Sequence, residues 1–258
     1  MLLEGRSSVI SGVGPGLGRS VALALAREGA DVALGARSAG VLRGVAAEVE
    51  ALGRRALWRP TDVAKPEQCE RLVADAVSAF GGVDVVVNGA ASFGRGARLA
   101  EGDVESLRGA FEVCFLGSLA LTRAALDSMR ARGGGRVVMI GSMATRDPRP
   151  GEGAYAAAKS ALLMAVRTLA VELGRDGIRV NAVNPGYIQG EPIQSAFRRR
   201  ASARRVEASA VEREIAESGA LGYIPSPDEI AGSVLFLASD LARPVTGHVL
   251  DCNAGMWM

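Results

Sequence analysis

The chain has 258 residues, of which 48% are hydrophobic, and its formal net charge at pH 7 is only +2. This length and composition suffice for one large α/β core, and the small net charge argues against nucleic acid or a membrane as the main partner. The three cysteines are widely spaced and lack metal-ligand spacing, so we expect reduced thiols, a cytoplasmic protein and no metal site. We expect neither a signal peptide nor a membrane span, and the single histidine is interpreted as structural.

Short apolar runs alternate with helical stretches along nearly the whole chain. Strands are predicted at residues 7–10, 31–35, 55–58, 83–88, 136–140, 178–183 and 249–251. Helices are predicted at residues 19–29, 38–53, 65–81, about 103–132 and 152–174, with a final helix before the last strand. Such alternation predicts a doubly wound, Rossmann-type α/β fold, with seven parallel strands and helices on both faces. Because no linker interrupts the pattern, we expect residues 1–258 to form a single domain.

A glycine-rich segment lies between the first predicted strand and the first predicted helix. Its glycines, Gly12, Gly16 and Gly18, let the backbone turn tightly and approach a pyrophosphate closely. The N-terminus of the following helix supplies N–H groups and a partial positive charge. The spacing G-xxx-G-x-G differs from the commoner G-x-G-x-x-G fingerprint, but its place between strand and helix predicts a dinucleotide site.

One of only two lysines in the chain, Lys159, stands four residues after Tyr155. Side chains at this spacing share one face of a helix. An ammonium beside the phenol would lower the pKa of Tyr155 from about 10 and make it a usable general acid/base. The alternative is a surface pair without function, because Tyr-xxx-Lys occurs by chance in many proteins.

These motifs together resemble the short-chain dehydrogenase/reductase family over essentially the full chain. Asp62-Val63 resembles that family's adenine-contacting pair, and Asn88-Gly89-Ala90 resembles its Asn-Asn-Ala segment. Ser142 stands 13 residues before Tyr155, which is the spacing of the family's catalytic serine. The turn before Ile188, with Pro185 and Gly186, resembles the one beside the nicotinamide. The resemblance implies a cofactor-binding set of Gly12, Gly16, Leu17, Gly18, Arg37, Ser38, Asp62, Val63, Asn88, Tyr155, Lys159 and Ile188.

The resemblance also implies a mechanism in which Tyr155 exchanges a proton with a carbonyl oxygen while hydride passes to or from the nicotinamide. Ser142 would hydrogen-bond that oxygen, where negative charge develops. Lys159 would lower the pKa of Tyr155 and hold the nicotinamide ribose. The hydride chemistry itself belongs to the cofactor.

The end of the second predicted strand bears on the choice of cofactor. An NAD-specific site places a carboxylate there, but Ala36 takes that place and Arg37 comes next. A guanidinium meets a 2′-phosphate bidentately, and Ser38 adds a hydroxyl. Against this, Pro15 stands where many NADP-preferring relatives carry a basic residue. The sequence predicts NADP, with NAD as the alternative.

Three positions depart from the family pattern. Cys114 stands where the family has a fourth catalytic residue, an Asn, and a thiol is a weak hydrogen-bonding group. Gly89 replaces the second Asn of the fourth-strand motif, and Gly190 replaces a cofactor-contacting Thr. We interpret Cys114 as a small buried hydrophobic side chain. The water relay that the family's Asn would anchor is therefore in doubt at this position.

Residues 189–225 interrupt the alternation beyond the sixth predicted strand. Because open α/β sheets bind ligands beyond the carboxyl ends of their strands, this insertion is interpreted as a helical lid over the substrate. The alternative is a solvated hairpin whose charges confer solubility. That the arginines of this segment bind an anionic substrate is a less favoured hypothesis. An apolar pocket is expected from four aromatic residues: Tyr187, Phe197, Tyr223 and Trp257.

The predicted function is that of a cytoplasmic NADP-dependent oxidoreductase acting on a ketone or secondary alcohol. The alternative is a protein of the same fold that binds a dinucleotide but catalyses a non-redox step, as an isomerase, cyclase or dehydratase. A non-catalytic binding protein is the third possibility. Small and apolar residues on more than one face of the two long helices predict a homotetramer or homodimer: Ala120, Leu121, Ala124, Ala125, Ala161, Leu162, Ala165 and Leu169.

Overall fold

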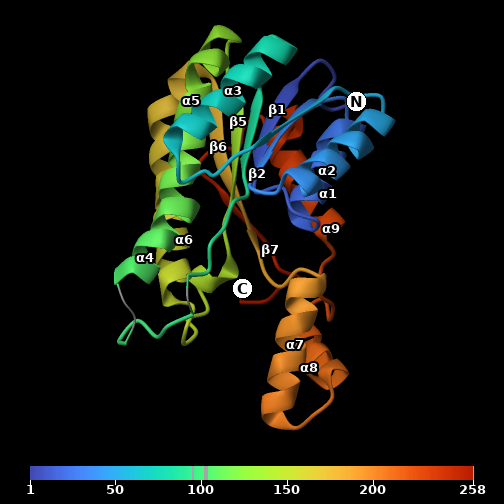
Figure 1. Ribbon diagram of the computed structural model, residues 1–258, viewed down its shortest axis with the longest axis vertical. Coiled ribbons are helices and arrows are strands. Elements are labelled where there is room, and N and C mark those ends of the chain that lie inside the picture. Colours follow the sequence, from blue (N-terminus) through green and yellow to red (C-terminus); the bar gives the residue numbers. More distant parts are fainter. Residues whose placement is uncertain (95, 102–103, 258) are drawn as a thin grey trace.

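The computed structural model describes residues 1–94, 96–101 and 104–257, and its centre is one parallel sheet. Its seven strands run in the order β3-β2-β1-β4-β5-β6-β7 (Figure 1). The chain therefore winds outward from β1 in one direction and from β4 in the other, which confirms the predicted doubly wound fold. The strands are β1 (Ser7–Ser11), β2 (Asp31–Ala36), β3 (Ala56–Pro60), β4 (Val85–Asn88), β5 (Gly135–Ile140), β6 (Ile178–Pro185) and β7 (Val249–Cys252).

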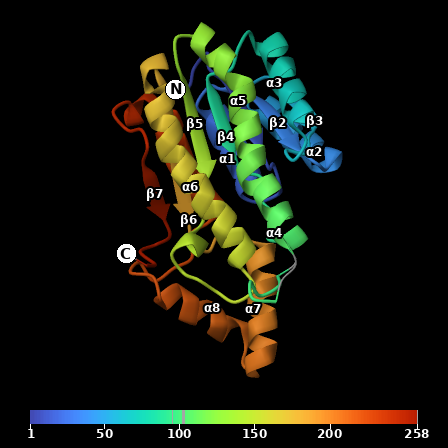
Figure 2. The same ribbon diagram turned by 90° about the vertical axis from the view of Figure 1, so that its left-hand side faces the viewer.

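Helices cover both faces of the sheet (Figures 1 and 2). One layer packs on the first face through one hydrophobic cluster and contains α1 (Leu17–Arg27), α2 (Ala39–Ala51) and α9 (Pro227–Ala238). The second face carries α3 (Pro66–Phe80), α5 (Gly117–Ala131) and α6 (Gly153–Leu173), whose apolar side chains form another cluster with the strands. Burial on both faces explains the apolar runs at residues 85–87 in β4 and 137–140 in β5.

The predicted element ends differ from the observed ones by one to a few residues. Strand β3, for example, continues to Pro60. Proline has no backbone N–H, but β3 is the edge strand, so Pro60 does not interrupt the hydrogen bonds of the sheet. Short helical turns at Met143–Thr145, Gly174–Asp176 and Asp240–Ala242 complete the connections. None of these differences moves a predicted strand out of the sheet.

The helix predicted at about residues 103–132 is not uniform. Its expected start at Asp103 lies outside the described residues, and the described part begins with α4 (Val104–Phe111). A π-helical turn, Glu112–Leu116, separates α4 from α5 and contains Cys114. Such turns widen the helix by one residue and are frequent at functional sites.

Two helical stretches, Leu107–Ala131 and Gly153–Asp176, are long and apolar enough to cross a bilayer by length and composition alone. In this fold both lie against the same face of the sheet, where Leu121, Met129, Leu162 and Val166 are fully buried in its core (Figure 2). Their apolar character is therefore accounted for in part by the sheet they cover.

The segment predicted as a lid forms a helical hairpin beyond the carboxyl end of β6, made of α7 (Glu191–Arg204) and α8 (Ala208–Glu217). It projects away from the sheet (Figures 1 and 2) and has a small core of its own, which includes Tyr187 and Phe197. Trp257 packs against this core, and its place in a substrate pocket stays a prediction. Tyr223 lies outside this core: it is 40% exposed and its hydroxyl donates to Glu229, and its place in an apolar pocket also stays a prediction.

Candidate active site

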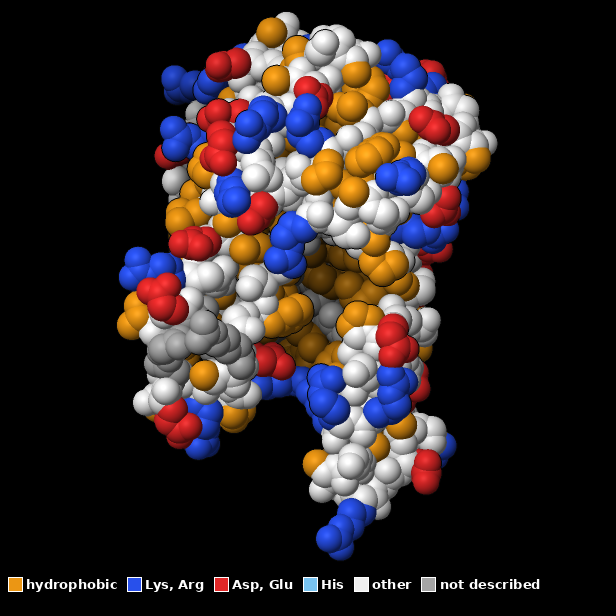
Figure 3. All heavy atoms as spheres, in the orientation of Figure 1, with side chains coloured by type: hydrophobic (Ala, Val, Ile, Leu, Met, Phe, Trp, Pro, Cys, Tyr) orange, Lys and Arg blue, Asp and Glu red, His pale blue; other side chains and the backbone are white. Residues whose placement is uncertain are grey.

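A cavity of about 910 Å³ lies at the carboxyl ends of the strands near β1. The molecule is hollowed on this side, between the sheet and the α7–α8 hairpin (Figure 3). A cavity of this size is within the range of cofactor sites. Seven of the predicted cofactor residues line it: Gly12, Leu17, Gly18, Arg37, Ser38, Asp62 and Val63.

The glycine turn fits a bound pyrophosphate. Gly12 has φ +74°, and a Cβ there would lie 2.4 Å from the backbone nitrogen of Ala90, so no side chain is accommodated. Gly16 precedes α1, and a Cβ on it would have no neighbour within 4 Å, which leaves open space over the helix N-terminus. The first turn of α1 contains no acidic residue to oppose an anion.

The other predicted cofactor residues lie outside the wall of this cavity. Asn88 is 1% exposed, and its Nδ2 donates to Thr122 Oγ1 at 2.9 Å. Its Oδ1 is buried without a hydrogen-bond donor among the described residues. Ile188 packs against the core cluster of α1. These positions surround the cavity, and their roles toward a cofactor remain predictions.

Lys159 is buried beside Tyr155 on α6. Only 1% of Lys159 is exposed, and its Nζ donates to the carbonyl oxygen of Ile140 at 2.6 Å. The Nζ lies 5.7 Å from the centroid of the Tyr155 ring. An ammonium has three N–H donors, and Ile140 is its one acceptor among the described residues. Two donors are thus left for a ligand such as a ribose hydroxyl.

The pKa of Tyr155 differs from the sequence expectation. Burial raises this pKa to about 12, and the hydrogen bond with Ser142 lowers it only in part. Burial also lowers the pKa of Lys159, because a charged amine is costly in an apolar site. Since the Lys159 ammonium is engaged with Ile140 rather than with the phenol, the expected lowering of the Tyr155 pKa is absent.

Ser142 is brought to this pair by the end of β5. Its Oγ accepts a hydrogen bond from the backbone N–H of Ala144 at 3.2 Å and caps the turn that follows. The same hydroxyl is close enough to Tyr155 to affect its pKa by hydrogen bonding. The three predicted catalytic side chains therefore converge, two from α6 and one from the end of the neighbouring strand β5.

Cys114 does more than fill space, so its interpretation as a buried hydrophobe is incomplete. Its Sγ accepts from the backbone N–H of Ser92 at 3.3 Å and donates to the Ser92 carbonyl at 3.5 Å. The next residue, Phe93, has its ring centroid 4.5 Å from that of Tyr155. The thiol thus fixes the loop that covers the candidate acid. No sequence signal marks Phe93, because 62 residues separate it from Tyr155.

Relatives of known function share this architecture along the whole chain. A family model described as Enoyl-(Acyl carrier protein) reductase matches residues 12–257. The chain is 35% identical to the L-rhamnose 1-dehydrogenase (NAD(P)(+)) of Sphingomonas sp. (strain SKA58), over 100% of this chain and 98% of that enzyme.

Solved structures agree with the sequence relatives. The L-sorbose reductase of Gluconobacter frateurii, complexed with NADPH and L-sorbose, superposes with a TM-score of 0.92 at 31% identity, covering 99% of this chain and 98% of the other. An NAD+-bound xylitol dehydrogenase gives 0.90 at 26% identity, covering 97% and 98%. The chain therefore belongs to the short-chain dehydrogenase/reductase family and is an NAD(P)-dependent oxidoreductase.

Proposed function

We propose that this enzyme transfers hydride between NADP(H) and a small ketone or secondary alcohol, with Tyr155 as general acid/base. The observation that carries the proposal is the convergence of Ser142, Tyr155 and a fully buried Lys159. A pKa of about 12 keeps the Tyr155 phenol protonated at neutral pH, which is the state that donates a proton to a carbonyl oxygen.

Each side chain has a distinct part in the proposed reaction. The Tyr155 hydroxyl gives its proton to the substrate oxygen, and the Ser142 hydroxyl stabilises the negative charge that develops there. Lys159 holds the nicotinamide ribose through its two unused N–H donors. When bound, the nicotinamide supplies the hydride.

The redox reaction is tested by following nicotinamide absorbance with a panel of ketones and each reduced cofactor. The panel begins with ketoses, because L-sorbose and L-rhamnose occur in the names of relatives. Oxidation of cofactor in step with ketone loss supports the proposal. Conversion of a substrate with no change in absorbance would instead support the isomerase, cyclase or dehydratase alternative.

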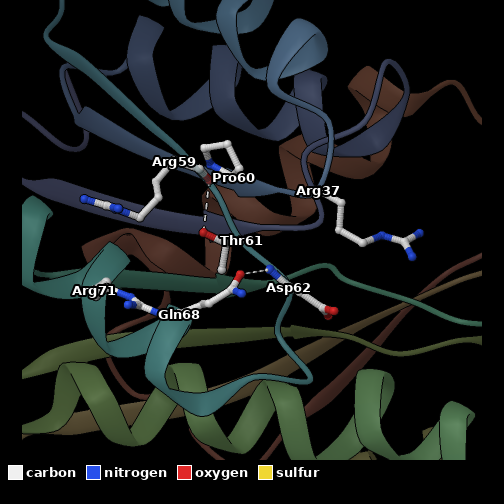
Figure 4. Close-up of a pocket in the computed structure, with 7 residues that line it drawn as sticks. All are labelled: Arg37, Arg59, Pro60, Thr61, Asp62, Gln68 and Arg71. Atoms are coloured by element: carbon white, nitrogen blue, oxygen red, sulfur yellow. Dashed lines mark hydrogen bonds between the residues drawn. The ribbon is translucent and has the colours of Figure 1, made fainter.

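Preference for NADP rests on the surroundings of Arg37. This side chain is exposed and lines both the large cavity and an adjoining cavity of about 400 Å³. In Figure 4, Arg37 and Asp62 project to one side of the smaller cavity, whereas Arg59 runs the other way. Arg59 is paired with Asp75. No carboxylate pairs with Arg37 among the described residues. Its guanidinium is therefore available to a 2′-phosphate.

Replacement of Arg37 by Ala is expected to weaken NADPH binding roughly tenfold to hundredfold, the range for one charge-assisted hydrogen bond. NADH binding should hardly change, since NADH lacks the 2′-phosphate. Titration of protein fluorescence with each cofactor measures both affinities. Arg175→Ala, an exposed arginine at the opposite end of β6, is the control and should leave both unchanged. Wild-type affinity for NADH equal to that for NADPH would contradict the proposal.

We also propose that the enzyme is a homotetramer or homodimer through the helices that cover one face of the sheet. Leu121, Ala125 and Leu162, which were expected on an outer face, are buried against the sheet instead. Other apolar side chains on these helices remain outside: Met164 is 57% exposed and Val171 is 83% exposed.

Sedimentation at micromolar protein concentration is expected to show an oligomer that Met164→Glu shifts toward the monomer. The added charge would be buried in the contact, which is costly. Glu172→Gln, at an exposed position on the same helix, serves as the control. A stable wild-type monomer under these conditions would rule out the proposal.

A further inference from the structure

The arginines of α7 have different surroundings, and one of them stands apart. Arg200 turns toward Tyr187, and its Nη1 lies 3.0 Å from the phenol oxygen. The others are engaged along the hairpin surface: Arg198 with Glu191, Arg199 with Ser195 and Arg204 with Glu214. Arg200 is also the half-buried one of the run 198–200.

A second guanidinium, that of Arg149 in the loop before α6, contacts the same phenol. Arg149 also donates to the Tyr187 oxygen, and it lies over that ring at 5.2 Å from the centroid, with Arg200 at 5.7 Å. Arg149 is at the same time 5.7 Å from the Trp257 ring. Tyr187 is only 8% exposed, so two cations converge on one largely buried aromatic side chain.

Only one of the two guanidinium groups is ion-paired: Arg200 lies near Glu214, but Glu214 pairs with Arg204 instead. Asp147 pairs with Arg149, but no carboxylate pairs with Arg200 among residues 1–94, 96–101 and 104–257. The neighbouring Asp251 is paired with Arg146. An anion between the two guanidinium groups would offset the repulsion between them. Each guanidinium has five N–H donors, most of which Tyr187 leaves unused.

This cluster adjoins the candidate catalytic residues. Arg149 lies in the loop that begins after Ser142 and ends at α6, which carries Tyr155. Tyr187 packs in one hydrophobic cluster with Met143, the residue next to Ser142. Figure 3 shows basic side chains along the lower edge of the hollow, near the α7–α8 hairpin. The arginine cluster therefore lies next to the stretch of chain that carries Ser142.

We propose that the substrate carries an anionic group, a carboxylate or a phosphate monoester, and that Arg200, Arg149 and Tyr187 bind it. This inference rests on the proposed oxidoreductase function and names the class of its substrate. The two guanidinium groups hold the anion, and the Tyr187 hydroxyl, which accepts from both arginines, donates its own proton to it. The anchored anion then fixes how far the carbonyl reaches toward Tyr155.

The test compares charged ketones with neutral partners of the same shape. A series of oxo acids of increasing chain length is assayed beside the corresponding primary amides, and ketose phosphates beside the free ketoses. We expect kcat/KM to favour one anionic series roughly tenfold to hundredfold, the size of one charge-assisted hydrogen bond. The series that responds tells whether carboxylate or phosphate is bound. Equal kcat/KM for charged and neutral partners would overturn the inference.

Arg200→Gln should lower kcat/KM for the anionic ketone roughly tenfold to hundredfold and so remove that preference. Arg199→Gln, one position away and hydrogen-bonded to Ser195, should keep it. Calorimetric titration of the NADPH complex with a carboxylate or phosphate analogue that lacks the ketone provides a readout without turnover. Arg200→Gln should weaken this binding by the same factor. Unchanged affinity in Arg200→Gln would also overturn the inference. Reduction of neutral ketoses alone would leave the proposed function intact while refuting the anionic substrate, whereas no cofactor oxidation with any ketone would refute both.

Discussion

Tyr155→Phe is expected to lower kcat by about 10²–10⁴-fold, the usual contribution of a positioned acid/base. The substitution removes only the hydroxyl. The ring that stacks on Phe93 and fills its buried place on α6 is retained, so the variant should fold and bind NADPH like the wild type. Steady-state kinetics give kcat, and cofactor fluorescence titration with thermal unfolding separates a loss of chemistry from a loss of structure.

Cys114→Ala is the matched control for this experiment, because it trims a fully buried side chain that also faces the site. The thiol holds the Ser92 backbone by two weak hydrogen bonds, so its loss should loosen the Phe93 loop and change kcat only a few-fold. A folded Cys114→Ala that loses as much activity as Tyr155→Phe would mean that the thiol takes part in the reaction. A nearly active Tyr155→Phe would show that another group is the acid.

The fold was predictable because its signals are local and repeated. Each strand is a short apolar run, each crossover is a helix with turn residues at its ends, and the glycine turn stands where the chain must approach a pyrophosphate. The Tyr155–Lys159 pair is four residues apart on one helix, so it could be placed on one face without knowing the tertiary structure.

The electrostatics of the site were not predictable in the same way. The pKa of Tyr155 depends on how deeply the phenol is buried and on whether the Lys159 ammonium bonds to it or to the Ile140 carbonyl. No residue spacing in the sequence indicates either property. The meeting of Arg149 with Arg200 joins positions 51 residues apart through a third element. Contacts of this kind arise from tertiary packing, so they had to be read from the structure.

A buried ion pair centred on Asp84 is another contact that arises from tertiary packing. Asp84, just before β4, has a side chain with 0% exposure, and it pairs with Arg6 and Arg132 at 3.0 Å each. Its second oxygen accepts from the backbone N–H of Ser7 at 2.9 Å. Burial alone would raise the pKa of Asp84, but the hydrogen bonds from Arg132, Ser7 and Arg6 outweigh it and lower this pKa. The carboxylate thereby ties β1, β4 and the end of α5 together.

Asp84→Asn is expected to lower the free energy of unfolding by about 3 kcal/mol at neutral pH, the lower end for removing one partner of a buried ion pair, because both arginines are partly exposed. A carboxyl whose folded-state pKa is depressed stabilises the fold fully above its unfolded-state pKa of about 4, and this contribution is lost as pH falls through the lower folded-state value. The difference between wild type and Asp84→Asn in denaturant titrations should therefore be constant from neutral pH down to about 5 and shrink below about 4. Asp127→Asn, whose side chain is 99% exposed beside Arg130, is the control and should change stability little. If the Asp84→Asn difference persisted unchanged in acid, its cause would be altered packing rather than the buried charge.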